Sequence, residues 1–305
     1  MEQRRIQKVG RSTLSVSLPK DWVNVTGVKR GDIVYLDKGK DGALRIFSKS
    51  LVEEQKKPKE YLINCDQASE PNLLERLVVG SYIMGVDVIK LFSSERIESK
   101  QTEAVRNIVR RLVGCSIIET SRREIILQCF IESSKLKIHP LIQRLSVIAS
   151  TMLDEAMEAL LKLNPKLAKD VIKREDEANN IYWLITRLLL SAQKSPTLAD
   201  MIGLNGDFDP TCVRLVSKSL ESIADCSQNI AKITLALHRI GNGMDKKELE
   251  KMSPIDQMTK EVFRKAVDSL FSSDIITAND AINLRTKLEA EVEAKMRKAV
   301  IPYFG

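Results

Sequence analysis

The pattern that most constrains the fold is the helical spacing of aliphatic residues from residue 141 to the end of the chain. Asn164-Pro165 and Asp209-Pro210 each place an N-cap residue before a proline, which is typical of a helix start. Ser253-Pro254 repeats this signal, and residues 194–210 predict an irregular loop. The expected helices span residues 141–163, 164–192, 209–240, 253–272 and 274–300. Long helices with short connections predict an antiparallel helical bundle over residues 141–305.

The helical region also shows an internal similarity. Residues 168–182 align with residues 278–292, and each segment follows a helix of similar character. Such a repeat predicts stacked copies of one helical unit, so we expect a tandem of three-helix units. Because only two helices of the second unit precede the last residue, we expect that unit to be incomplete.

The middle of the chain, residues 59–134, predicts a small α+β domain. Strands are expected over residues 61–65, 86–92, 115–119 and 125–131, and helices over residues 70–84 and 99–113. This order is βαβαββ, which is typical of a helix layer on a sheet. We find no catalytic constellation there and expect a scaffold or dimer-forming role, with a small-ligand sensor as the alternative. Residues 51–60 are polar and predict a linker.

Positive charge is concentrated in the first 50 residues. They contain eleven Lys and Arg against five Asp and Glu, so they carry +6 of the chain's net charge of +7. A basic module on a nearly neutral remainder is typical of a polyanion-binding head. Leu14, Val16 and Leu18 alternate with polar residues and predict a half-buried strand. Fifty residues with four short strands have too little core to stand alone, whereas two interleaved copies would bury enough.

The segment QKVGRSTLSVSLPKDWV, followed by RGDIVYL, resembles the SpoVT/AbrB-type swapped-hairpin DNA-binding domain. In that family two chains exchange hairpins and present loop arginines to DNA. The resemblance implies that residues 1–50 form a homodimer that binds duplex DNA. The residues that it assigns to DNA contact are Arg4, Arg5, Lys8, Arg11, Ser12 and Lys20.

A second resemblance covers the helical region. LESIADCSQNIA, over residues 220–231, resembles the acidic motif of the PhoU family, and VIKREDEANNIYWLI, over residues 171–185, is similar to its other acidic helix. The resemblance implies a regulator of phosphate uptake that acts with a phosphate transporter or signalling protein. Some family members bind iron or zinc through carboxylate pairs. The fusion of an AbrB-like head to a PhoU-like body is similar to archaeal phosphate-uptake regulators.

The carboxylates of this region can be examined one by one. Glu221 and Asp225 are four residues apart, so both face one side of a helix and could share a divalent or iron cation. Asp176 and Asn180, on the preceding helix, are expected to supply oxygens from the facing side. The alternative is that Glu221 and Asp225 are ordinary solvated carboxylates, with Glu221 close to Lys218.

The second helical unit should bind no metal. Thr286 and Ala290 occupy the positions that match Asp176 and Asn180. Neither side chain is a carboxylate, so the residues that would hold a cation are missing there.

Several classes of protein are excluded or disfavoured. The sequence contains no P-loop, HExxH or nucleophile-elbow motif, so we do not expect an enzyme. No apolar run is long enough to cross a bilayer and no apolar signal core opens the chain, so we expect a cytoplasmic protein. The five cysteines are far apart and form no CxxC motif, which predicts buried, reduced thiols.

Two hypotheses for function remain. The first is a DNA-binding transcription regulator that senses phosphate status through its helical body. The second is an accessory protein of a phosphate transport system, whose N-terminal domain serves mainly dimerisation. The basic head separates them, because an adaptor does not need Arg4, Arg5, Lys8 and Arg11 on one small domain.

Overall fold

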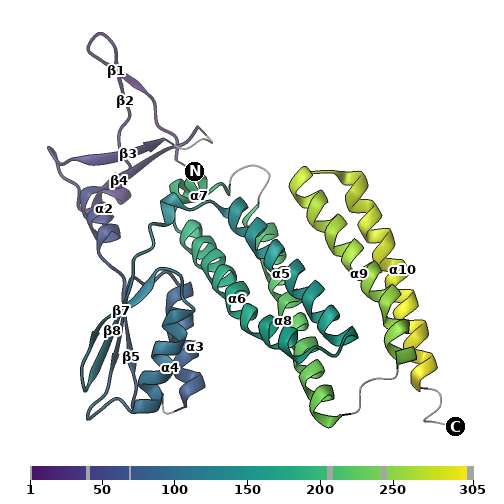
Figure 1. The fold of residues 1–305 in the computed structure, drawn as a ribbon. Coiled ribbons are helices and arrows are strands. Elements are labelled where there is room, and N and C mark those ends of the chain that lie inside the picture. Colours follow the sequence, from purple (N-terminus) through teal and green to yellow (C-terminus); the bar gives the residue numbers. More distant parts are fainter. Residues whose placement is uncertain (1, 39–41, 69, 205–208, 242–245, 301–305) are drawn as a thin grey trace. The chain divides into compact units, whose positions relative to one another are not determined.

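The computed structural model describes residues 2–38, 42–68, 70–204, 209–241 and 246–300. The chain divides into two compact units, Met1–Lys59 and Glu60–Gly305, which are described separately below (Figure 1). Among the described residues, no helix is both long and apolar enough to cross a membrane.

The first unit is built from two hairpins and two short helices. Strands β1 (Gln7–Val9) and β2 (Thr13–Ser15) pair antiparallel, as do β3 (Val34–Lys38) and β4 (Leu44–Ser48), in two separate two-stranded sheets. Helix α1 (Lys20–Thr26) ends at Gly27, whose φ of 67° is left-handed. The strand predicted around Leu14, Val16 and Leu18 is shorter than expected, because β2 ends at Ser15. The predicted linker over residues 51–60 is wrong in its first part, because helix α2 (Lys49–Lys56) continues into it.

The apolar side chains of the first unit are largely exposed. Leu14 is 67% exposed, Val16 is 49% exposed and Ile33 is 67% exposed. Ser48 is the one buried residue within the described part of this unit. The predicted half-buried strand is therefore wrong for a single chain. The expectation of too little core for independent stability agrees with this exposure.

The first part of the second unit is a helix layer on a four-stranded sheet (Figure 1). The strands β5 (Glu60–Asn64), β6 (Val88–Phe92), β7 (Cys115–Thr120) and β8 (Glu124–Cys129) lie in the order β5-β6-β8-β7, with only β5 and β6 parallel. Helices α3 (Pro71–Ile83) and α4 (Ser99–Arg110) follow β5 and β6, so the βαβαββ order agrees with the prediction. Ile89, Leu91 and Leu127 are fully buried in the core of this layer.

The remainder of the unit is helical. After a short 3-10 turn at Ser133–Lys135, the helices α5 (Ile138–Leu161), α6 (Pro165–Gln193) and α8 (Pro210–Ile240) each pack against the other two. Asn164 Oδ1 accepts hydrogen bonds from the amides of Lys166 and Leu167, and Asp209 caps α8 in the same way. Both predicted caps are confirmed.

A second group of helices follows. Helices α9 (Lys246–Ser272) and α10 (Ile275–Val300) form a hairpin, and α9 also contacts α5. The described residues thus contain a three-helix bundle of α5, α6 and α8 and a helical pair of α9 and α10.

Two predicted boundaries in the helical region are wrong. The expected loop over residues 194–210 contains helix α7 (Pro196–Ile202), capped by the Ser195 hydroxyl. Helix α9 begins at Lys246, so Pro254 lies inside the helix and does not start it. Residues 246–252 are strong helix formers, and a single proline removes only one backbone hydrogen bond. Cys65, Cys115 and Cys129 are buried free thiols as expected, but Cys212 and Cys226 are exposed.

Arg187 joins the sheet layer to the bundle within the second unit. Its side chain is 3% exposed and comes from α6. Its guanidinium donates hydrogen bonds to the carbonyls of Tyr82 (2.6 Å) and Val86 (2.9 Å). It also lies 5.0 Å from the centre of the Tyr82 ring and 3.6 Å from the Asp87 carboxylate. The cation thus satisfies carbonyls at the C-terminal end of α3, where the helix dipole favours positive charge.

We expect Arg187→Met to destabilise the second unit by about 2–4 kcal/mol, because it removes the charged donor to the Val86 carbonyl and leaves the Tyr82 carbonyl with the Gly85 amide alone. Urea unfolding followed by circular dichroism measures this loss. Arg144→Met is the matched control, since Arg144 is exposed on α5, and it should change stability by less than about 0.5 kcal/mol. Equal midpoints for the two variants would contradict the role assigned to Arg187.

Candidate functional site

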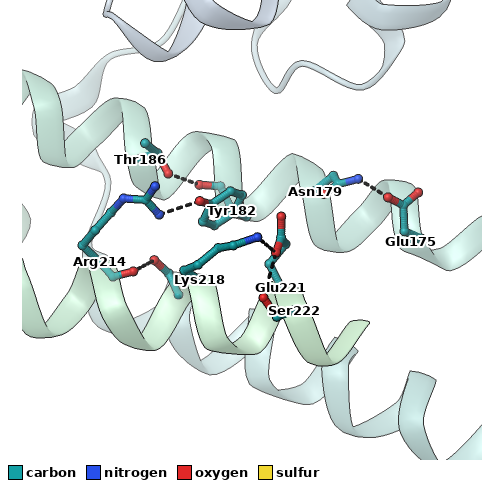
Figure 2. Close-up of polar contacts among 9 residues, drawn as sticks. Glu175, Asn179, Tyr182, Thr186, Arg214, Lys218, Glu221 and Ser222 are labelled. Carbon is teal, nitrogen blue, oxygen red and sulfur yellow. Dashed lines mark hydrogen bonds and ion pairs between the residues drawn. The ribbon is translucent and has the colours of Figure 1, made fainter. Parts of the chain in front are cut away.

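A polar stripe runs along the interface between α6 and α8 (Figure 2). Helix α6 contributes Glu175, Asn179 and Tyr182, which are spaced four and three residues apart. Helix α8 contributes Arg214, Lys218, Glu221 and Asp225 at the same helical spacing. Such spacing places the members of each set on one face of their helix, so two polar stripes face one another across the interface.

At one end of this site, two cations of α8 surround the side chain of Tyr182. Arg214 Nη1 donates a hydrogen bond of 2.5 Å to the Tyr182 hydroxyl, and the guanidinium carbon lies 5.2 Å from the centre of the tyrosine ring. Lys218 Nζ lies 5.7 Å from the same ring centre. Two cations against one buried aromatic ring form favourable cation–π contacts and hold both side chains in place.

Glu221 lies next to this cluster and is only 8% exposed. Its carboxylate pairs with Lys218 Nζ one turn earlier on α8 and accepts a longer hydrogen bond of 3.5 Å from the Ser222 hydroxyl. The hydrogen bond to Glu221 raises the pKa of Lys218, so the ammonium stays charged. The ion pair with Lys218 offsets the cost of burying the charged Glu221 carboxylate.

Glu175 occupies the other end of the site. The Asn179 amide donates a hydrogen bond to its carboxylate, and Arg111 lies 4.0 Å away. Burial raises the pKa of Glu175, Arg111 opposes this shift, and the negative charges of Asp176 and Asp225 add to it. Glu175 thus carries a carboxylate that burial disfavours and that, among the described residues, only Arg111 and Asn179 stabilise.

Asp225 lies on α8, one turn beyond Glu221. Burial raises its pKa, the neighbouring Glu221 carboxylate raises it further, and Lys218 and Lys232 lower it. Glu175 and Asp225 are therefore two carboxylates that the fold makes harder to ionise. Raised carboxyl pKa values in one place are a feature of binding and switching sites.

The structure does not bring the predicted metal ligands together. Asp176 points to Arg111 in an ion pair of 2.7 Å, with 53% of its side chain exposed, whereas Glu221 pairs with Lys218. The Asn180 Oδ1 atom is buried and makes no hydrogen bond in the described structure. Among the described residues, no group of three or more His, Cys, Asp or Glu is placed to hold a metal ion. In this arrangement the residues do not fit a resident cation, and metal binding by Glu221, Asp225, Asp176 and Asn180 stays a prediction without support.

Sequence reasoning expected Glu221 close to Lys218, and this proximity is confirmed. It missed four other residues of the site: Glu175, Asn179, Tyr182 and Arg214. The signal that would have found them is the phase of the buried stripe on α6. Val171 and Ala178 are fully buried, and Glu175 lies between them on the same face, at four and three residues from each. Asp176 is rotated by about 100° away from that face.

The predicted DNA-contacting residues lie in the first unit. Arg11 and Ser12 lie in the loop between β1 and β2, after Gly10, whose φ of 67° is left-handed. Lys8 lies on β1 opposite Leu14, and Lys20 is the first residue of α1. The predicted residues are all exposed: Arg4, Arg5, Lys8, Arg11, Ser12 and Lys20.

Comparison with protein families bears on the helical site. Residues 142–234 match the PhoU domain. The match begins in α5, ends in α8 and contains all the polar stripe residues of Figure 2. It covers just under a third of the chain and links this region to the regulation of phosphate homeostasis. No curated protein and no solved structure matches the chain.

Asp225→Asn should change the pH dependence of stability. Because the folded pKa of Asp225 is raised, the native state holds a proton that the unfolded state releases, and wild-type stability falls as the pH rises through that folded pKa. The variant lacks this loss. We therefore expect its stability relative to wild type to increase between about pH 4 and pH 7, as measured by urea unfolding at each pH.

Asp209→Asn is the control of opposite sign. Hydrogen bonds from the Thr211 amide lower the pKa of Asp209, so the wild type gains stability as the pH rises from that folded pKa to the ordinary carboxyl value. Asparagine is an equally good N-cap, so only the charge is lost. Parallel pH profiles for the two variants would contradict the assignment.

Metal analysis tests the carboxylates. Since the Lys218 ammonium already pairs with Glu221, we expect wild type incubated with iron, zinc or manganese to keep little metal after dialysis. Lys218→Gln, which frees that carboxylate, should keep more. The opposite result would be stoichiometric metal in the wild type and none in the Glu221→Ala/Asp225→Ala variant. That result would show that the carboxylates leave their ion pairs to bind the metal.

Proposed function

We propose that this protein is a DNA-binding transcription regulator of phosphate uptake. In this proposal the first unit binds duplex DNA as a homodimer. The helical region senses phosphate status or docks a partner such as a phosphate transporter or signalling protein. The observation that carries the DNA-binding role is the β1–β2 hairpin, which presents Arg11 at its tip beside other exposed cations.

The charges of the hairpin support this role. In the described residues Arg5, Lys8, Arg11 and Lys20 are exposed and have no ion-pair partner, although Arg4 pairs with Glu2. Cations that are not neutralised by the fold are available to phosphates, which supply most of the affinity for DNA. A two-stranded β-ribbon fits the major groove, so a hairpin with an arginine at its tip has suitable dimensions for reading base edges.

The exposed apolar residues support association with a second copy. Leu14, Ile33, Leu36 and Leu44 are each more than half exposed in the single chain. An apolar surface of this kind on a small unit without a buried core needs a partner. A second copy is the occupant that we propose, because the same unit of the other chain has the same deficit.

The alternative is an accessory protein of a phosphate transport system, with a head that only dimerises. The PhoU match supports either function, since it lies entirely in the helical region. Dimerisation alone would use the apolar residues and leave Arg11 without a role. DNA binding by the full chain separates the two hypotheses.

We expect Arg11→Ala to weaken binding of the full chain to duplex DNA more than Lys49→Ala does. Arg11 lies at the hairpin tip, whereas Lys49 already pairs with Glu53 at 3.7 Å. A bidentate arginine contact to a base edge is worth about 1–3 kcal/mol, and fluorescence anisotropy with a labelled duplex measures the loss. Equal effects of the two substitutions would mean that diffuse charge, not the hairpin, binds DNA.

The salt dependence provides the second measurement. A dimer that makes about 6–8 phosphate contacts should show a slope of about −5 to −7 in a plot of log affinity against log salt. A flat response would reject DNA binding through phosphate contacts and would favour the accessory role.

A further inference from the structure

A polar groove lies along the outer face of α4, away from the α6–α8 site. It encloses about 520 Å³ and is bounded by α4, the segment that precedes it and the turn between β7 and β8. Four arginines line it: Arg96, Arg106, Arg110 and Arg122. Glu103 is the one acidic residue in the lining, so the groove carries a clear excess of positive charge.

The fold itself makes no visible use of these four arginines. All four are exposed, and their side chains make no ion pair or hydrogen bond within the described residues. Arg106 and Arg110 are four residues apart on one helix face, and like charges at this spacing repel one another and weaken the helix. By contrast Arg111, the next residue, forms an ion pair with Asp176 and lies over the Trp183 ring. A bound anion would offset the repulsion between these arginines and so explain why they lie together.

Other groups of the groove also suit an anion. Ser99 lies in the lining and is the first residue of α4. The capping box at this end uses the amides of Glu98 and Gln101, with the Glu98 carboxylate as one acceptor, and within the described residues the Ser99 amide makes no hydrogen bond. The positive end of the helix dipole adds to the field of the arginines.

The composition of the lining selects the type of anion. Arginine, unlike lysine, presents a planar fork of donors that matches phosphoryl oxygens in two places at once. The groove has no aromatic side chain on which a nucleobase could stack. Its apolar member, Ile97, is buried. Recognition is therefore directed at phosphoryl groups and not at a base.

The length of the groove excludes a single phosphate as the full ligand. Ser99 and Arg110 are eleven residues apart on α4, which is about 16 Å along the helix axis. We propose that the α4 groove binds an inorganic condensed phosphate, a linear chain of phosphoryl groups that contacts several arginines together. This site is separate from the proposed DNA-binding hairpin and does not depend on it.

The experiment uses the full chain and sodium tripolyphosphate as the probe, with isothermal titration calorimetry at near-physiological salt. We expect Arg106→Gln/Arg110→Gln to bind the probe at least tenfold more weakly than wild type. Arg76→Gln, at an exposed arginine on α3, is the matched control and should bind within twofold of wild type. Unchanged circular dichroism spectra establish that the variants fold.

Three further arms identify the ligand. Orthophosphate should bind more weakly than tripolyphosphate, because it reaches fewer arginines. ATP should bind no more tightly than tripolyphosphate, since the groove offers nothing to its base. Arg106→Lys/Arg110→Lys should recover only part of the lost affinity, because lysine keeps the charge and loses the fork.

The proposal is overturned if wild type shows no tripolyphosphate binding up to millimolar concentration, or if Arg76→Gln loses as much affinity as the double variant. A third result also overturns it: wild type does not bind tripolyphosphate, and Arg106→Gln/Arg110→Gln weakens binding to duplex DNA. The groove would then be part of a nucleic-acid surface. If Arg11→Ala loses DNA binding and still binds tripolyphosphate, the groove remains a condensed-phosphate site. The two proposals can therefore be rejected independently of one another.

Discussion

The buried Arg187 is the contact on which the second unit depends. A charged group in a protein interior is stable only when its donors are satisfied. Arg187 meets most of this condition, because its Nη1 donates to the carbonyls of Tyr82 and Val86 and its Nη2 lies 3.6 Å from the Asp87 carboxylate, although its buried Nε has no hydrogen-bond partner among the described residues. Tyr82 is itself fully buried, and its hydroxyl donates to the Val113 carbonyl (3.0 Å), just beyond α4. This α6 side chain is therefore one of the contacts that hold the sheet layer against the bundle.

Helix α6 extends this connection to the functional site. Arg187 holds its C-terminal half, and Arg111, at the end of α4, pairs with Asp176 near its middle. Trp183 packs against the core of the sheet layer and against that of the bundle. The face of α6 that meets α8 is thus positioned from behind by the sheet layer. The α4 groove and the α6–α8 site are joined through adjacent residues, because Arg110 lines the groove and Arg111 contacts Asp176 beside Glu175.

Local signals in the sequence predicted local structure well. The caps at Asn164 and Asp209 placed two helix starts correctly, because a side-chain acceptor and a following proline act within one turn. Pro254 gave the same signal, but the helix-forming residues before it outweigh one lost hydrogen bond. The candidate site was harder, because it depends on helix phase and on tertiary neighbours. Asp176 was chosen for its spacing, whereas the packing of α6 partly buries Glu175 beside Asn179 and Arg111. Arg111 and Arg187 could not be assigned at all, since their partners are 65 and 105 residues away in the chain.

The two units differ in what their sequences can specify alone. The second unit buries continuous apolar clusters around the sheet and inside the bundle, so its fold is determined within one chain. The first unit forms its hairpins but leaves Leu14, Ile33 and Leu36 in solvent, and backbone pairing alone contributes little net free energy. In the proposed homodimer, the burial that a second copy supplies would provide most of its stability. If the hairpin binds DNA, folding, dimerisation and DNA binding of this unit are linked equilibria. The affinity for DNA should therefore depend on protein concentration more steeply than that of a preformed monomeric domain.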